Sequence, residues 1–144
     1  MQGIRKVLNW IKREYDNPPV IVTENGFSDK LGNLDDMQRI YYLKHYINNV
    51  LKAIQMDGCN VQGYVAWSLL DNFEWSFGYT QKFGLVRVDF DSPNRTRTAK
   101  ESSKFLAKLA EDNGFLPSNS VALVPGLMTT PIVVLCFFVS FLIG

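Results

Sequence analysis

Residues 20–26, with the sequence VIVTENG, form a short apolar run that ends in a carboxylate, an amide and a glycine. The β-branched residues at 20–23 favour a strand, and apolar side chains at successive positions are typical of a parallel strand that is buried on both faces. Glu24 follows at the tip of this predicted strand. A carboxylate at the end of a buried strand is the first indication of a functional site.

Helical patterns stand on both sides of this strand. Residues 4–15 place apolar side chains on one face, and Asn-Pro-Pro at 17–19 ends that helix. A longer helix is predicted to begin at a capping box formed by Asp35 and Gln38 and to end at Gly58. One apolar stripe marks its buried face: Ile40, Leu43, Ile47, Val50, Leu51 and Ile54.

The alternation continues toward the C-terminus. Residues 61–69 predict a second strand, 71–84 an aromatic loop, and 85–90 a short strand. A third helix is expected at 98–112, because its first four residues, TAKE, have the capping-box pattern. This order predicts an α/β fold with a parallel sheet. Two main strands cannot close a barrel, so the chain is either an unusual small α/β domain or a piece of a larger one.

Composition narrows the function. The 144 residues are 47% hydrophobic, which fits one globular domain, and the net charge of +1 without a basic block gives no reason to expect a nucleic-acid partner. No zinc-binding spacing is present, and His45 has no evident ligand partner. A disulfide between Cys59 and Cys136 is not expected, since Cys136 lies in an apolar tail. Charges interrupt the first fifteen residues, which therefore do not resemble a signal peptide.

Two motifs carry a resemblance: VTENG at 22–26 and WSLLDNFEW at 67–75. Together they resemble the C-terminal third of glycoside hydrolase family 1, whose members are (β/α)8 barrels that hydrolyse β-glucosides and β-galactosides with retention. The resemblance spans residues 4–110. It implies the last two strands of a TIM barrel with their flanking helices, followed by a hydrophobic C-terminal segment. Lactase-like and klotho-like members resemble the chain most, because they also carry a C-terminal membrane segment.

By resemblance, Glu24 is the catalytic nucleophile, Trp67 the platform under the sugar ring, and Glu74 with Trp75 the pair that binds sugar hydroxyls. Phe83 helps to form the wall of the same pocket. Without the resemblance, Glu24 could equally cap a turn and Trp67 could be a core residue. The other residues of the loop are expected only to pack: Asp71, Asn72, Phe73, Phe77 and Tyr79.

The family's acid/base glutamate lies in a Thr-x-Asn-Glu-Pro segment on an earlier strand, and no Asn-Glu-Pro occurs here. Lys82 also stands where the family has arginine. No metal or cofactor is implied, since two carboxyl groups suffice for this reaction. Three hypotheses follow: a membrane-anchored retaining β-glycosidase, a catalytically inactive klotho-like binding protein or chaperone, and a truncated product without activity. The motifs do not distinguish glucose from galactose and say nothing of oligomeric state.

The chain is expected to divide into a partial barrel at 1–114, a linker at 115–122 and a hydrophobic anchor at 123–143. The anchor is uncharged and about as long as the roughly 20 residues that a spanning helix needs. A lipid-anchor signal beginning at 118–120 and a tail packed on the protein are alternatives. Either anchor places the catalytic side in the endoplasmic reticulum lumen or at the cell surface. Asn94 is a candidate glycosylation site in an Asn-x-Thr sequon.

Overall fold

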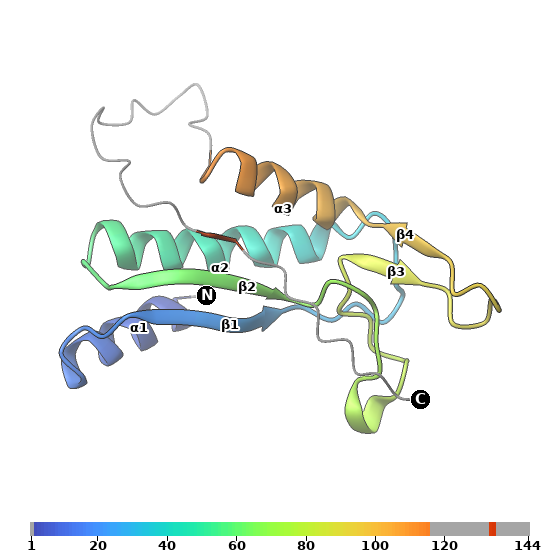
Figure 1. Ribbon diagram of the computed structural model, residues 1–144, viewed down its shortest axis with the longest axis horizontal. Coiled ribbons are helices and arrows are strands. Elements are labelled where there is room, and N and C mark those ends of the chain that lie inside the picture. Colours follow the sequence, from blue (N-terminus) through green and yellow to red (C-terminus); the bar gives the residue numbers. More distant parts are fainter. Residues whose placement is uncertain (1, 116–132, 135–144) are drawn as a thin grey trace.

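Helices and parallel strands alternate along the protein in a computed structural model that describes residues 2–115 and 133–134 (Figure 1). The predicted order of helix, strand, helix, strand and helix is confirmed. The elements are α1 (Gly3–Glu14), β1 (Val20–Gly26), α2 (Met37–Gln55), β2 (Val61–Trp67), the 3-10 turn η1 (Trp75–Phe77), β3 (Val86–Val88), β4 (Arg97–Ala99), α3 (Glu101–Glu111) and β5 (Val133–Val134).

β1 and β2 are parallel neighbours, which confirms the predicted parallel pairing. Their register joins Val20 to Val61 at one end and Gly26 to Trp67 at the other, with an irregularity between Val22 and Asn25. β5 adds a parallel strand on the other side of β2. The region predicted as a single short strand at 85–90 instead forms β3 of an antiparallel hairpin with β4, a pairing that no sequence pattern indicated.

The core lies between these strands and a layer of helices. α2 runs alongside β1 and β2 and contacts both α1 and α3 (Figure 1). Gly58, with φ +64°, follows α2 in the left-handed conformation that the sequence predicted for its end. The buried apolar cluster consists of Leu8, Leu43, Ile47, Val50, Ala53, Cys59, Val61, Tyr64, Ala66, Leu85, Leu106 and Leu109.

One prediction about β1 is wrong. Val20 and Val22 pack against the core cluster, but Ile21 between them is 59% exposed. Successive side chains of a strand point to opposite faces, so Ile21 lies on the face of β1 away from this core cluster. The expectation of burial on both faces therefore fails for β1, whereas β2 is buried at four successive positions, residues 63–66.

The capping box predicted for α2 is also wrong. The residue that precedes the helix is Asp36 rather than Asp35, and its side chain makes no bond to its own helix backbone. Its carboxylate instead accepts hydrogen bonds from the amide (2.9 Å) and the hydroxyl (2.6 Å) of Ser102 in the first turn of α3. Arg39 donates to the same carboxylate at 2.9 Å. Asp36 thus caps a helix that lies far along the chain, where a negative charge is favourable.

The capping box predicted at 98–101 fails for a related reason. Thr98 belongs to β4, and α3 begins at Glu101 after Lys100, which makes no side-chain cap. The Lys100 ammonium group is fully buried and donates to Asp71 Oδ1 at 3.0 Å. Burial lowers the pKa of Lys100, and Asp71 partly offsets that effect. The charge of Lys100 therefore serves a buried ion pair and not the helix terminus.

The predicted linker and hydrophobic anchor lie outside the described residues, apart from Phe115 and the two residues of β5. Among the residues that the structure does describe, no helix combines the length and the hydropathy needed to cross a membrane. Cys59 is buried in the core, and Cys136 is not among the described residues.

Asp36→Ala should destabilise the chain far more than Asp35→Ala. Removing one member of a buried ion pair typically costs about 3–5 kcal/mol, because it leaves an uncompensated charge on Arg39. Asp35 is exposed, and such surface changes usually stay within about 0.5 kcal/mol. Urea unfolding followed by circular dichroism measures both effects. A larger loss for Asp35→Ala would restore the capping box and contradict the assigned role of Asp36.

Candidate active site

Glu24 lies near the end of β1 with an exposed side chain. Its neighbour Asn25 points toward the helical layer, where its amide donates to the Tyr42 hydroxyl at 3.2 Å and its carbonyl accepts from the Tyr64 hydroxyl at 2.6 Å. Val22, three residues earlier, packs against the core as well, so side chains do not alternate regularly here; the register of β1 shifts between Val22 and Asn25, and both Thr23 and Glu24 are exposed. The Glu24 carboxylate is therefore exposed next to a residue that two tyrosines hold in place.

The ends of β1 and β2 meet at Gly26 and Trp67. The two residues are paired in the parallel ladder, and a Cβ atom added to Gly26 would lie 1.9 Å from the Trp67 carbonyl oxygen. Only glycine permits this approach. The TENG motif thus keeps the strand end that carries Glu24 directly beside the first residue of the WSLLDNFEW motif.

Trp67 and Glu74 contact each other. The indole Nε1 of Trp67, which is half-buried at the end of β2, donates to Glu74 Oε1 at 3.3 Å. Glu74 is only 7% exposed although it lies in a loop. The structure therefore brings the predicted ring platform and one predicted hydroxyl-binding residue together, and the indole holds the carboxylate in place.

Phe83 and Trp75 are placed differently from each other. The Phe83 carbonyl accepts a hydrogen bond from the Ser68 amide at 3.2 Å, which holds Phe83 next to the residue that follows Trp67. Trp75 opens the turn η1 and is 86% exposed, so its indole points away from packed contacts. Of the sugar-binding residues expected here, Trp67, Glu74 and Phe83 lie close together along this edge, and Trp75 projects into solvent.

The structure gives Asp71 and Lys82 contacts that the sequence analysis did not predict. Asp71, expected only as loop packing, is 3% exposed and accepts from Lys100 and from the Gly84 amide at 2.9 Å. Lys82, which stands where arginine was expected, accepts from Arg39 through its carbonyl, and its ammonium group lies 5.2 Å from the Phe90 ring centroid. The contacts of Asp71 with Lys100 and of Lys82 with Arg39 join residues far apart in the sequence, so no spacing could reveal them.

The described part of the chain contains no group of three metal-binding side chains. His45 lies on α2, and its Nδ1 is 2.8 Å from the Tyr41 carbonyl oxygen, as a helix-surface side chain would be. Asn94 is exposed in the connection between β3 and β4, and its glycosylation stays a prediction. The chemistry available at this edge is therefore that of carboxylates and aromatic rings.

Comparison with known proteins agrees with this arrangement. The sequence profile of Glycosyl hydrolase family 1 matches residues 1–115. Myrosinase 1 of Brevicoryne brassicae is 56% identical over 101 residues, which are 70% of this chain and 22% of that protein. Homo sapiens lactase/phlorizin hydrolase is 52% identical over 112 residues, or 78% of this chain and 6% of that protein. Mus musculus klotho is 48% identical over 116 residues, which are 80% of this chain and 11% of that protein.

Solved structures give the same result. Aphid myrosinase superposes with a TM-score of 0.74 and 53% sequence identity, over 75% of this chain. A family 1 β-glucosidase from Humicola insolens in complex with glucose superposes with a TM-score of 0.73 and 43% sequence identity, over 77% of this chain. The chain covers 23% and 24% of those two proteins. These neighbours are TIM-barrel enzymes. The expectation that the chain forms only part of such a barrel is confirmed.

Tyr42→Phe should remove part of the late alkaline titration of the protein. Burial, with Tyr46 alongside, raises the pKa of Tyr42 to about 12, whereas an unfolded tyrosine has a pKa of about 10. Since the folded chain holds this proton more tightly, its contribution to stability is complete below about pH 10 and is lost as the pH rises toward 12. Absorbance of tyrosinate and urea unfolding across this window measure the two effects.

Tyr41→Phe is the matched control, because Tyr41 is 54% exposed on the same helix. It shows how much of any change comes from the loss of one tyrosine hydroxyl as such. Burial also raises the pKa of Tyr64, so some late titration persists in the Tyr42 variant. Identical titrations of the Tyr42→Phe variant and the unmodified chain would contradict the half-buried setting of Tyr42 on α2, where its hydroxyl contacts Asn25.

Proposed function

Because the chain belongs to glycosyl hydrolase family 1, we propose that it is the C-terminal part of a retaining β-glycosidase in which Glu24 is the nucleophile. The observation that carries this proposal is the exposed Glu24 carboxylate at the end of a parallel strand, beside the contact between Trp67 and Glu74. Barrel enzymes build their active sites at this end of the strands. The similarity to β-glucosidases and to lactase/phlorizin hydrolase supports the substrate class, a β-glycoside.

In the proposed mechanism a Glu24 oxygen attacks the anomeric carbon of the sugar. The bond from that carbon to the glycosidic oxygen breaks, and a second carboxyl group protonates the leaving oxygen. Water, deprotonated by the same second group, then attacks the anomeric carbon and releases Glu24. The two carboxyl groups of a retaining enzyme lie about 5 Å apart. The acid/base comes from an earlier strand, which the 144 residues do not contain.

In this proposal the sugar is bound by the last residue of β2 and by the loop that follows it. Trp67 offers a flat ring on which the C–H groups of a pyranose can lie. Glu74 accepts hydrogen bonds from adjacent sugar hydroxyls, and the Trp75 indole donates to another. Phe83 forms part of the wall of the sugar pocket. The Trp67–Glu74 contact of 3.3 Å supports this assignment, because it orients the carboxylate before a sugar arrives. Trp75 is 86% exposed, so its indole N–H is accessible to a sugar hydroxyl.

A second candidate is a klotho-like membrane protein that keeps the barrel and binds a partner without hydrolysis. The similarity to mouse klotho and beta-klotho favours it. The acid/base residue on the earlier strand distinguishes the glycosidase from the binding protein. The reading frame upstream of Met1 can be sequenced from the source transcript. A strand that carries Asn-Glu-Pro would support the glycosidase, and a different residue in place of that glutamate would support the binding protein.

Glu24→Gln in the longer protein that contains this chain should lower hydrolysis of an aryl β-glucoside by about 10⁴-fold, since an amide cannot form the glycosyl-enzyme intermediate. Steady-state kinetics measure the loss. Glu111→Gln is the matched control, because Glu111 is an exposed residue at the end of α3 and should retain full activity. Normal turnover by the Glu24 variant would show that Glu24 is not the nucleophile.

The purified 144-residue chain by itself should show no hydrolysis of the same substrate. It contains the proposed nucleophile but no Asn-Glu-Pro segment, and a retaining mechanism needs both carboxyl groups. The assay compares the unmodified chain with its Glu24→Gln variant. Turnover that disappears in the variant would mean that this chain assembles a complete site, and the prediction would be refuted.

A further inference from the structure

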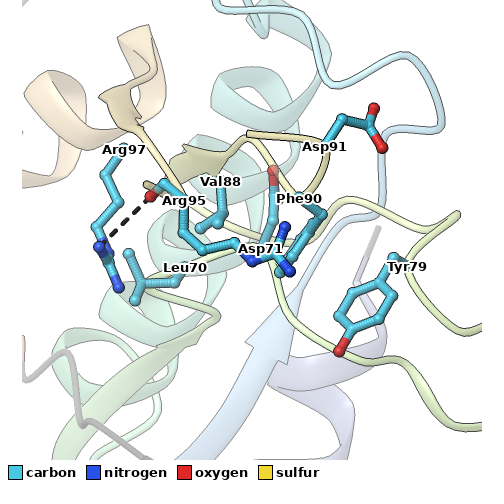
Figure 2. Close-up of a pocket in the computed structure, with 8 residues that line it drawn as sticks. All are labelled: Leu70, Asp71, Tyr79, Val88, Phe90, Asp91, Arg95 and Arg97. Carbon is cyan, nitrogen blue, oxygen red and sulfur yellow. Dashed lines mark hydrogen bonds between the residues drawn. The ribbon is translucent and has the colours of Figure 1, made fainter. Parts of the chain in front are cut away.

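A hollow of about 470 Å³ opens between the segment that follows β2 and the β3–β4 hairpin (Figure 2). Asp71 and Tyr79 contribute from the first of these, and Phe90, Asp91, Arg95 and Arg97 from the second. The volume lies within the range of about 300–1,000 Å³ in which proteins bind small molecules. None of the functions considered so far uses this hollow.

Two guanidinium groups give the hollow a positive wall. Arg95 donates to the Ser92 carbonyl at 3.3 Å, and Arg97 to the Arg95 carbonyl at 3.4 Å, the contact drawn in Figure 2. Neither arginine forms an ion pair with a carboxylate in the part of the chain that the structure describes. Lys100 already neutralises Asp71, so Asp91 alone among the acids of the lining opposes the two arginines. The wall therefore favours an anion.

The base of the hollow offers an acceptor. Asp71 is 3% exposed, and both of its hydrogen bonds, from Lys100 and from Gly84, go to Oδ1. Its Oδ2 is buried and has no partner among the described residues. A buried carboxylate oxygen without a donor is unfavourable, so this position favours a ligand that brings a hydroxyl group.

Aromatic rings supply the apolar side. The centroids of Tyr79 and Phe90 are 4.2 Å apart, and Lys82 lies 5.2 Å from the Phe90 centroid. Such rings pack against the C–H groups of a sugar. Lys82 strengthens the positive potential next to them.

From these features we propose that the hollow binds a small anionic sugar, that is, a phosphate or carboxylate group on a polyhydroxylated ring. Arg95 and Arg97 hold the anionic group, since a guanidinium fork matches the oxygens of both phosphate and carboxylate. A ring hydroxyl donates to Asp71 Oδ2, and the ring lies against Tyr79 and Phe90. This binding does not depend on hydrolysis by Glu24 and is a property of the 144-residue chain itself.

Isothermal titration of the full chain tests the proposal with four probes: glucose 6-phosphate, glucuronic acid, glucose and inorganic phosphate. At least one of the two anionic sugars should bind saturably, about tenfold tighter than glucose or phosphate alone, and the affinity should fall with added salt. Which of the two binds more tightly identifies the preferred anion. Equal affinity for glucose, or no binding of either anionic sugar, would overturn the proposal.

Variants locate the binding. Arg95→Gln combined with Arg97→Gln should weaken it at least about tenfold, and Asp91→Asn should strengthen it, because a repelling charge is removed. Arg87→Gln is the matched control, since Arg87 is an exposed residue of β3 that does not line the hollow. Circular dichroism confirms that each variant is folded. Unchanged affinity in the double variant, or weaker binding by the Asp91 variant, would place the anion elsewhere.

Discussion

Asp36 and Arg39 form an ion pair whose side chains are each 1% exposed, and the pair of Asp71 with Lys100 is completely buried. Taking charges out of water is costly, and such pairs are tolerated only where further hydrogen bonds satisfy them. Here Arg39 also donates to three backbone carbonyls, and Asp71 accepts the amide of Gly84. The start of α2, the start of α3 and the loops between the strands are therefore held by one polar network.

The loop that carries the second motif depends on this network more than on apolar packing. Asp71 is held by Lys100 near its beginning, Glu74 by Trp67 in its middle, and the carbonyls of Lys82 and Gly84 by Arg39 at its end. Its large apolar side chains mostly face solvent: Phe73 at 58%, Trp75 at 86% and Phe77 at 60% exposure. Fixed charges and backbone bonds set the shape of this loop, and so the position of Glu74.

Periodicity was enough to predict the helices and the two long strands, because it reports which face of each element is buried. The motifs likewise located Glu24 and Trp67 at adjacent strand ends. What the sequence could not reveal are contacts between distant residues. Asp36 caps a helix turn at Ser102, 66 positions away, and local capping rules cannot detect such a partner. The exposure of Ile21 was missed because a strand's apolar pattern reflects the whole sheet, including parts that this chain lacks.

The incomplete sheet also determines how far Glu24 is exposed to water. The helices bury one face of β1 and β2, and two tyrosines hold Asn25 next to the exposed Glu24. The Glu24 carboxylate and Ile21 are both exposed to water. Electrostatic stabilisation of a transition state is strong only where water is excluded. The contacts around Glu24, the proposed nucleophile, are thus local to this chain, whereas the enclosed environment that the proposed reaction needs has to come from the other strands of a closed barrel.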